Sequence, residues 1–142
     1  MLGPMKRSLA LLALGAVLAA CAITGREATT DLPGTSWVLV ELDGAEPVGD
    51  AAPSIAFAED GTVSGSTGCN TFTGSVTIDG TSLEFGPLAT TRMACADASA
   101  NEQEQAFLLA MEEVTSYTID EDGRLVLEGE SPLVFEVAAE GG

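Results

Sequence analysis

The feature that most constrains what this chain can fold into is an apolar run from Leu9 to Ala20, which follows two basic residues and ends at Cys21. A basic segment, an apolar segment and small residues before a cleavage point are, in that order, the parts of a secretory signal. The run contains 12 residues, whereas a helix needs about 20 apolar residues to cross a bilayer. We therefore predict that residues 1–20 are a signal peptide and that only the remainder folds.

The cysteine at the end of this run predicts a lipid anchor. Leu18-Ala19-Ala20-Cys21 resembles the bacterial lipobox, in which the cysteine thiol receives diacylglycerol before cleavage. The alternative is an ordinary signal peptide that happens to end in cysteine. Two or three acyl chains hold a protein stably on a membrane, because each buried CH₂ contributes about 0.8 kcal/mol. We expect lipidation at Cys21, a tether over residues 21–33, and an extracytoplasmic protein on the outer face of the cell membrane or on the outer membrane.

The part that remains is predicted to be one strongly acidic domain. Removal of residues 1–20 leaves 122 of the 142 residues, enough for one core over residues 34–138 and a short tail over 139–142. Three arginines against 22 carboxylates give this part a net charge of −19. Binding to nucleic acid or flat on anionic lipid requires clustered basic residues, so both are excluded. We interpret the acidity as a means of staying soluble rather than as a specific site for cations.

Alternation of apolar and polar residues predicts antiparallel strands over most of the domain. The segment Trp37 to Leu42 differs, because its almost continuous apolar residues favour a strand covered on both faces. Turn residues at 59–61, 79–80 and 120–123 predict hairpins between strands. The expected strands are 36–42, 54–58, 62–66, 71–78, 83–85, 117–119, 125–127 and 133–137.

One segment changes to a helical period. Asn101 with Glu104 three residues later resembles a capping box, which predicts a helix from about Asn101 to Val114. The apolar residues on one face of this helix are Phe107, Leu108, Met111 and Val114. We interpret that face as core packing against the sheet rather than as a ligand-binding stripe.

The residue types argue against catalysis. The chain has no histidine, so a serine or cysteine nucleophile lacks its usual base and the histidine-containing zinc sites cannot form. The acidic turn Asp120 to Gly123 does not have the ligand spacing of a calcium loop. Carboxylate pairs can perform acid–base chemistry, but the sequence nominates none of the 22. We expect no catalytic residues, no metal and no cofactor, and a protein that is not an enzyme.

Two cysteines remain in the domain, Cys69 and Cys95. An even number in an exported chain favours a disulfide, and closing a loop of this length contributes about 3 kcal/mol in the chain-entropy model. The alternative, a redox-active pair, is typically spaced as Cys-x-x-Cys beside a cation. Arg92 is near in sequence, but the spacing differs, so we predict a structural disulfide.

Several separated motifs carry a family resemblance. They are Gly34-Thr35-Ser36-Trp37-Val38-Leu39, then Gly68-Cys69-Asn70 followed by Phe72 and Gly74, and Thr90-Thr91-Arg92-Met93-Ala94-Cys95 ahead of the helix at Glu104 to Phe107. In this order they resemble the META domain, the family of the HslJ-like heat-shock proteins, over about residues 33–137. The resemblance implies an α+β fold, in which a predominantly antiparallel, curled or barrel-like β-sheet packs on one amphipathic helix. It also implies exported or lipid-anchored proteins associated with heat shock and novobiocin resistance, without established catalytic residues.

The candidate binding residues are Arg92 and Asn70. Arg92 is one of three basic residues in the domain and tether, and its guanidinium suits an anion or a carboxylate of a partner; an internal salt bridge is the alternative. Asn70 suits a tight turn, because asparagine tolerates the left-handed conformation. The preferred function is a non-enzymatic protein that binds or stabilises another envelope component under stress. The second hypothesis is a carrier of a small apolar ligand inside a barrel-like sheet, and the third is an enzyme that uses carboxylates or the cysteine pair.

Overall fold

The computed structural model describes residue 3 and residues 31–139. This part of the chain forms nine strands and one helix. Eight strands and the helix fall on segments expected from the sequence, whereas the two-residue strand β6 was not expected. The elements are β1 (Thr35–Leu42), β2 (Ser54–Phe57), β3 (Thr62–Ser66), β4 (Thr71–Asp79), β5 (Ser82–Phe85), β6 (Ala89–Thr90), α1 (Ala98–Glu112), β7 (Ser116–Ile119), β8 (Leu125–Glu128) and β9 (Leu133–Val137).

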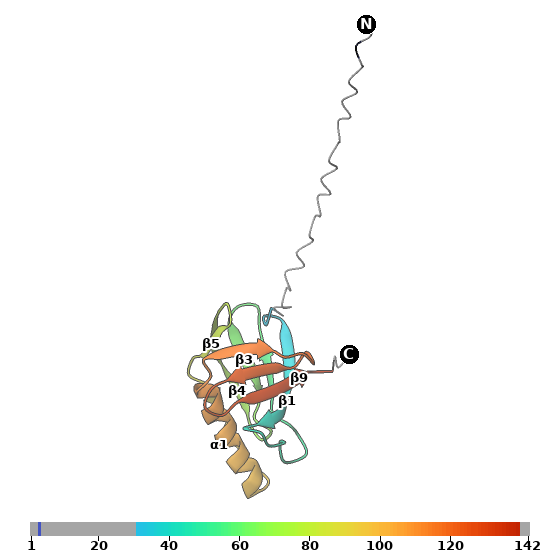
Figure 1. Cartoon of the computed structure of the whole chain (residues 1–142). Helices are drawn as coiled ribbons and strands as arrows, with labels where there is room; N and C mark the ends of the chain where they lie inside the picture. Colours follow the sequence, from blue (N-terminus) through green and yellow to red (C-terminus); the bar gives the residue numbers. More distant parts are fainter. Residues whose placement is uncertain (1–2, 4–30, 140–142) are drawn as a thin grey trace.

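The strands form one antiparallel sheet that curls until its ends meet. The strand order is β3-β2-β1-β9-β8-β7-β5-β4-β6, and an additional pairing of β3 with β4 closes eight strands into a ring. The β6 strand extends the sheet beside β4. Figure 1 shows the curled strands with α1 packed at one end of the ring. The predicted fold class, a curled antiparallel sheet with one helix, is confirmed.

The inside of the ring is filled with large apolar side chains. The tryptophan and four of the five phenylalanines of the chain are less than 3 % exposed, and burying a side chain of this size contributes roughly 1.5–3 kcal/mol. The indole N–H of Trp37 donates to Thr35 Oγ1 at 2.7 Å, so the burial leaves no unpaired donor there. The largest fully buried side chains are Trp37, Phe57, Phe72, Phe107, Phe135, Leu32, Leu39, Ile55, Leu83, Met111, Leu125 and Leu127.

Closure of the ring depends on a glycine in β3. Gly65 lies opposite Phe72 of β4. A Cβ atom at Gly65 would collide with the carbonyl oxygen of Ser54 and come within 2.8 Å of the Phe72 ring. The missing side chain therefore gives Phe72 the space in which it packs inside the ring.

The expectation for β1 was wrong. Its side chains alternate, with Trp37 and Leu39 each 1 % exposed and Val38 and Val40 only partly buried. The register against β9 shifts between Leu39 and Glu41, so Val40 forms a bulge. The continuous apolar run reflects an outer face that is partly covered, not a strand enclosed on both sides.

The predicted start of the helix was also wrong. The N-cap is Asp97, not Asn101, and its carboxylate accepts from the backbone N–H of Ala100 at 2.8 Å and from Ser99 Oγ at 2.7 Å. The hydrogen bond from Ser99, followed by that from Ala100, lowers the pKa of the Asp97 carboxyl below its usual 3.8. The helix thus begins three residues before Asn101, and Glu104 points elsewhere. Of the expected apolar face, Phe107, Met111 and Val114 are buried and Leu108 is partly buried. The helix ends at Glu112, so Val114 lies just beyond it.

The signal-peptide prediction for residues 1–20 and the lipidation prediction at Cys21 lie outside the described residues. Across the described part of the chain, no helix combines the length and the apolar character that crossing a membrane requires.

Candidate functional site

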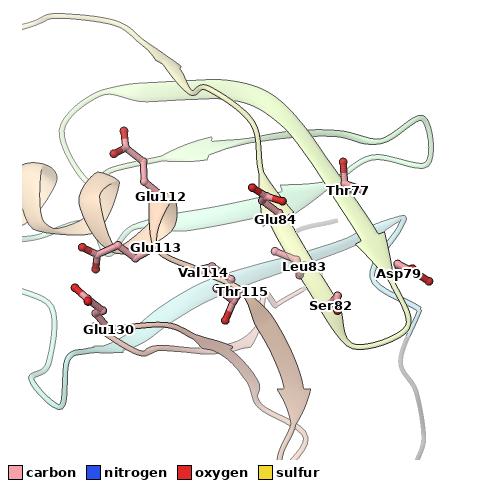
Figure 2. A pocket seen from close by; sticks show the side chains of 10 residues that line it. All are labelled: Thr77, Asp79, Ser82, Leu83, Glu84, Glu112, Glu113, Val114, Thr115 and Glu130. Carbon is pink, nitrogen blue, oxygen red and sulfur yellow. The ribbon is translucent and has the colours of Figure 1, made fainter.

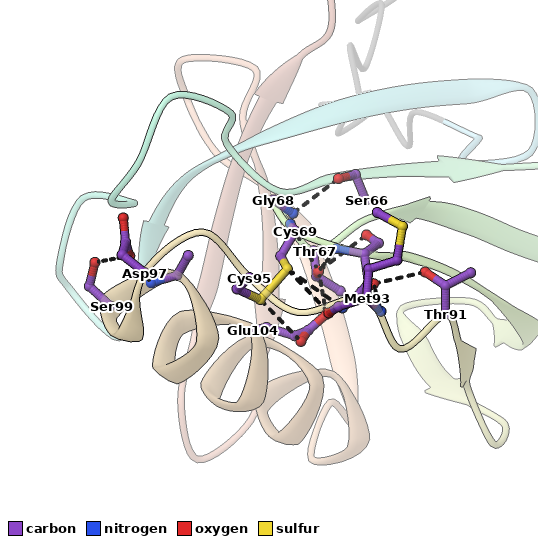
Figure 3. Close-up of a disulfide and its surroundings, with 12 residues drawn as sticks. Ser66, Thr67, Gly68, Cys69, Thr91, Met93, Cys95, Asp97, Ser99 and Glu104 are labelled. Carbon is purple, nitrogen blue, oxygen red and sulfur yellow. Dashed lines mark hydrogen bonds between the residues drawn. A yellow bond between two sulfur atoms is a disulfide. The ribbon is translucent and has the colours of Figure 1, made fainter.

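The predicted disulfide between Cys69 and Cys95 is present in the structure, with the two Cα atoms 5.5 Å apart. Cys69 lies in the turn between β3 and β4, and Cys95 lies in the segment that leads from β6 to α1. The bond therefore fastens residues 91–95, which we call the Arg92 loop, to the wall of the ring (Figure 3). A loop closed over a sequence separation of 26 residues contributes about 3 kcal/mol to stability in the chain-entropy model.

Asn70 fastens the same loop a second time. Asn70 is 4 % exposed, and its side chain lies against the backbone of Met93. Oδ1 accepts from the Met93 N–H at 2.8 Å and from Thr91 Oγ1 at 3.0 Å, while Nδ2 donates to the Met93 carbonyl at 3.1 Å and to Glu104 Oε1 at 2.8 Å. These four bonds use both donors and both acceptor positions of the amide. The side chain of Asn70 is thus fully engaged inside the protein.

Glu104 connects this amide to the helix. Its Oε1 atom accepts from Asn70 Nδ2 at 2.8 Å and from Thr67 Oγ1 at 2.7 Å. Thr67 is completely buried, and its hydroxyl also accepts from the backbone N–H of Asn70 at 2.8 Å. The glutamate expected to cap the helix therefore binds the β3–β4 turn instead. The result is a polar cluster in which every buried side-chain nitrogen and oxygen of the described residues has a partner.

The two candidate binding residues end up in different roles. Arg92 is exposed and makes no ion pair within residues 31–139, while its neighbour Met93 is 68 % exposed. Asn70 presents no free polar group at the surface, so any role of Asn70 in binding acts through the Arg92 loop. The left-handed position in this turn is Gly68, with φ of 92°, rather than Asn70.

A groove lies between β5 and the C-terminal end of α1. This groove has a volume of about 630 Å³ and includes Leu83 and Val114 in its lining. Figure 2 shows Glu112, Glu113 and Glu130 on one side of this groove and Glu84 and Asp79 on the other. The groove lies where neighbouring strands of the ring share the fewest paired residues, because β5 and β7 have one register pair, Ser82 with Ser116. The acidic lining residues are Asp79, Glu84, Glu112, Glu113 and Glu130, and no basic residue accompanies them.

Sequence reasoning missed the groove and the Asn70 cluster for the same reason. The carboxylates of the groove come from β4, β5, the end of α1 and the turn after β8. The partners of Asn70 are 21 to 34 positions away. The motif Gly68-Cys69-Asn70 marked the region, but the pattern alone does not tell which atoms meet.

These features define a closed antiparallel barrel that carries one helix and a disulfide-fastened loop on its wall. The chain belongs to the META domain family, whose match spans residues 30–140. No curated protein matches the sequence.

Solved structures share the fold. The chain is similar to a protein from Burkholderia xenovorans, solved by NMR, at 26 % identity and a TM-score of 0.63, with 77 % of this chain and 85 % of that chain covered. It is similar to a second protein solved by NMR at 28 % identity and a TM-score of 0.62, over 78 % of this chain and 95 % of that one. A DUF4847 family protein from Bacteroides vulgatus, at 16 % identity and a TM-score of 0.51 over 74 % of this chain and 93 % of that chain, shares the fold alone.

Proposed function

We propose that this META-domain protein is held to a bacterial envelope by lipid on Cys21 and binds another envelope protein, without catalysing a reaction, through the Arg92 loop. The observation that carries the proposal is the double fastening of that loop. The disulfide holds it at Cys95, and Asn70 holds both backbone polar groups of Met93. Affinity is gained when a contact surface is ordered before its partner arrives, because less conformational freedom is lost on binding.

The chemistry of the loop suggests the chemistry of the partner. Arg92 offers five N–H donors in a planar fork that matches a carboxylate. Met93 beside it is an exposed, adaptable apolar side chain. We expect a partner surface with a carboxylate next to an apolar patch. The net charge of this protein repels such a surface, so approach is favoured where Arg92 projects.

The structure gives less support to the carrier hypothesis. Apolar side chains from the ring strands and α1 occupy the inside of the ring. A ligand there would have to displace Trp37 or one of the buried phenylalanines. A filled core with an exposed apolar side chain beside an arginine favours a protein partner over a small apolar ligand.

The test is site-specific photo-crosslinking in intact cells, with a photoreactive residue at position 94. Three forms of the protein are compared: one otherwise wild type, one with Arg92→Ala and one with Met93→Ala. We expect one reproducible crosslinked protein in wild type, with yield reduced about 5- to 30-fold by either change, the range of a loss of 1–2 kcal/mol at an interface. Leu109→Ala is the matched control, because Leu109 is also an exposed apolar residue, 56 % exposed in the last turn of α1. Cys21→Ala should abolish the crosslink if the lipid places the domain.

Melting temperatures of the purified variants separate recognition from folding. Arg92→Ala should have the same melting temperature as wild type, because Arg92 has no ion pair to lose within the described residues. Equal crosslinking by wild type, Arg92→Ala and Met93→Ala would refute the assignment of the loop. A crosslink that survives Cys21→Ala would refute the anchoring.

A further inference from the structure

The disulfide and Glu104 bring three potential metal ligands together. One Sγ of each cysteine and a carboxylate oxygen of Glu104 all lie within 4.8 Å of one another. The three residues come from the β3–β4 turn, the Arg92 loop and α1, and each is partly buried. Figure 3 shows the glutamate side chain directed at the sulfur pair.

The two oxygens of Glu104 have different surroundings. Oε1 accepts hydrogen bonds from Thr67 and Asn70. Oε2 faces Cys95 Sγ at 3.8 Å, and a sulfur in a disulfide carries no hydrogen to donate. Oε1 is therefore held by two neutral donors, whereas Oε2 faces the sulfur of Cys95 and receives no hydrogen bond from it. Hydrogen bonds to a ligating group from such outer partners are what orient the ligands of protein metal sites.

We propose that reduction of the disulfide converts Cys69, Cys95 and Glu104 into a binding site for one Zn²⁺ ion. Reduction by a dithiol adds two electrons and two protons, breaks the S–S bond and leaves the dithiol as its own disulfide. Zinc then displaces both protons, because thiolates and not thiols bind the metal. Two thiolates, Glu104 Oε2 and one water complete a tetrahedron.

The required movement is small. In a tetrahedral zinc site with Zn–S near 2.3 Å and Zn–O near 2.0 Å, sulfurs are about 3.8 Å apart and a sulfur and an oxygen about 3.5 Å apart. The Cys95 Sγ to Glu104 Oε2 distance of 3.8 Å is already close to that value. A disulfide bond holds two sulfurs about 2.05 Å apart, so the sulfurs of Cys69 and Cys95 separate by less than about 2 Å once that bond is broken. Rotation of the two cysteine side chains supplies this.

The electrostatic setting favours a cation. Net charge is −19 after the predicted cleavage, with 22 carboxylates and no lysine beyond residue 20. Thiolates make the site selective, because soft sulfur ligands prefer zinc over magnesium or calcium. Bound zinc would also keep the Arg92 loop attached to the β3–β4 turn when the covalent link is lost, so the loop stays ordered in both redox states.

The test uses the full chain with Cys21→Ala, which leaves Cys69 and Cys95 as the only thiols. Oxidised and phosphine-reduced samples are titrated with Zn²⁺ in excess Mg²⁺, which saturates exposed carboxylates. We expect one zinc per reduced chain by native mass spectrometry, with affinity at least about 100-fold above that of the oxidised chain, since a disulfide has no thiolate to offer. Co²⁺ in place of Zn²⁺ should give thiolate charge-transfer absorption and the ligand-field bands of a tetrahedral site.

Variants on α1 test the carboxylate. Glu104→Gln keeps an oxygen for Thr67 but loses the anionic ligand, and should weaken zinc binding at least about 10-fold. Glu102→Gln, which removes an exposed carboxylate from the same helix, should leave binding unchanged. Equal zinc affinity in oxidised and reduced chains, or equal loss in both variants, overturns the proposal. If the reduced chain unfolds, zinc should restore its fold and raise its melting temperature, and failure to do so also overturns it.

Discussion

Replacement of Asn70 by alanine is the most informative single change to this protein. The substitution removes four hydrogen bonds of 2.8 to 3.1 Å from a residue that is 4 % exposed. A net contribution of about 1 kcal/mol for each bond, and somewhat more for the bond to the Glu104 carboxylate, gives a loss of about 4 kcal/mol. The loss is large because Thr67 and Glu104 remain in place with an amide missing between them.

The same loss can be expressed as a melting temperature. Unfolding entropy is about 2.1 cal/mol/K per residue, so a domain of about 110 residues loses roughly 15–20 °C for 4 kcal/mol. The assay is thermal unfolding followed by circular dichroism, with the disulfide intact in every sample. Amide hydrogen exchange adds a local readout, because the Met93 N–H donates to Asn70 and should lose protection in the variant.

The chain offers a matched control. Asn101, the only other asparagine, is exposed on α1. Asn101→Ala should change stability by no more than about 0.5 kcal/mol. If Asn70→Ala melts within about 3 °C of both wild type and Asn101→Ala, the reasoning about this cluster is refuted. Retained protection of the Met93 amide would refute it equally.

Three further predictions follow from the ring, the helix and the turns. Gly65→Ala should destabilise by about 3 kcal/mol or prevent folding, because its Cβ meets the Ser54 carbonyl oxygen; a melting temperature within 2–3 °C of wild type, which corresponds to about 0.5–0.7 kcal/mol, would contradict the account of ring closure. Glu112→Lys should stabilise by about 0.3–1 kcal/mol in a denaturant titration, since it puts a cation in the last turn of α1. Glu102→Lys, nearer the start of the same helix, should gain less. The pKa values of Asp97, lowered mainly by Ser99, and Asp120, lowered mainly by the Arg124 backbone N–H, lie below 3.8. Their contribution to stability is therefore present above pH 3.8 and lost as pH falls through the lowered values, and Asp97→Asn should show a smaller loss on acid titration than wild type.

Local interactions explain what the sequence predicted well. Hairpin turns at 59–61, 79–80 and 120–123 join neighbours along the chain, so alternation and turn residues suffice to place the flanking strands. The disulfide was predictable because the domain has two cysteines. The apolar face of α1 followed from its period.

Competition between neighbours and long-range contacts explains what was missed. Asp97 and Asn101 are both good caps, and the chain uses the first one, which frees Glu104 to reach the β3–β4 turn. Strand β6 is two residues long and exists because β4 offers its edge. The hydrogen bond between Asn70 and Glu104 spans 34 positions, and no local pattern specifies such a pair.

Closure of the sheet has a consequence for crowded copies of this protein. Because β3 pairs with β4, the strand order within residues 31–139 ends in one terminal strand, β6, which pairs with β4 and leaves its other edge free. A free sheet edge is a template on which another chain can add strands and aggregate. Two residues are too short a template to start that process, so the free edge of β6 does not lead the sheets of neighbouring molecules to join.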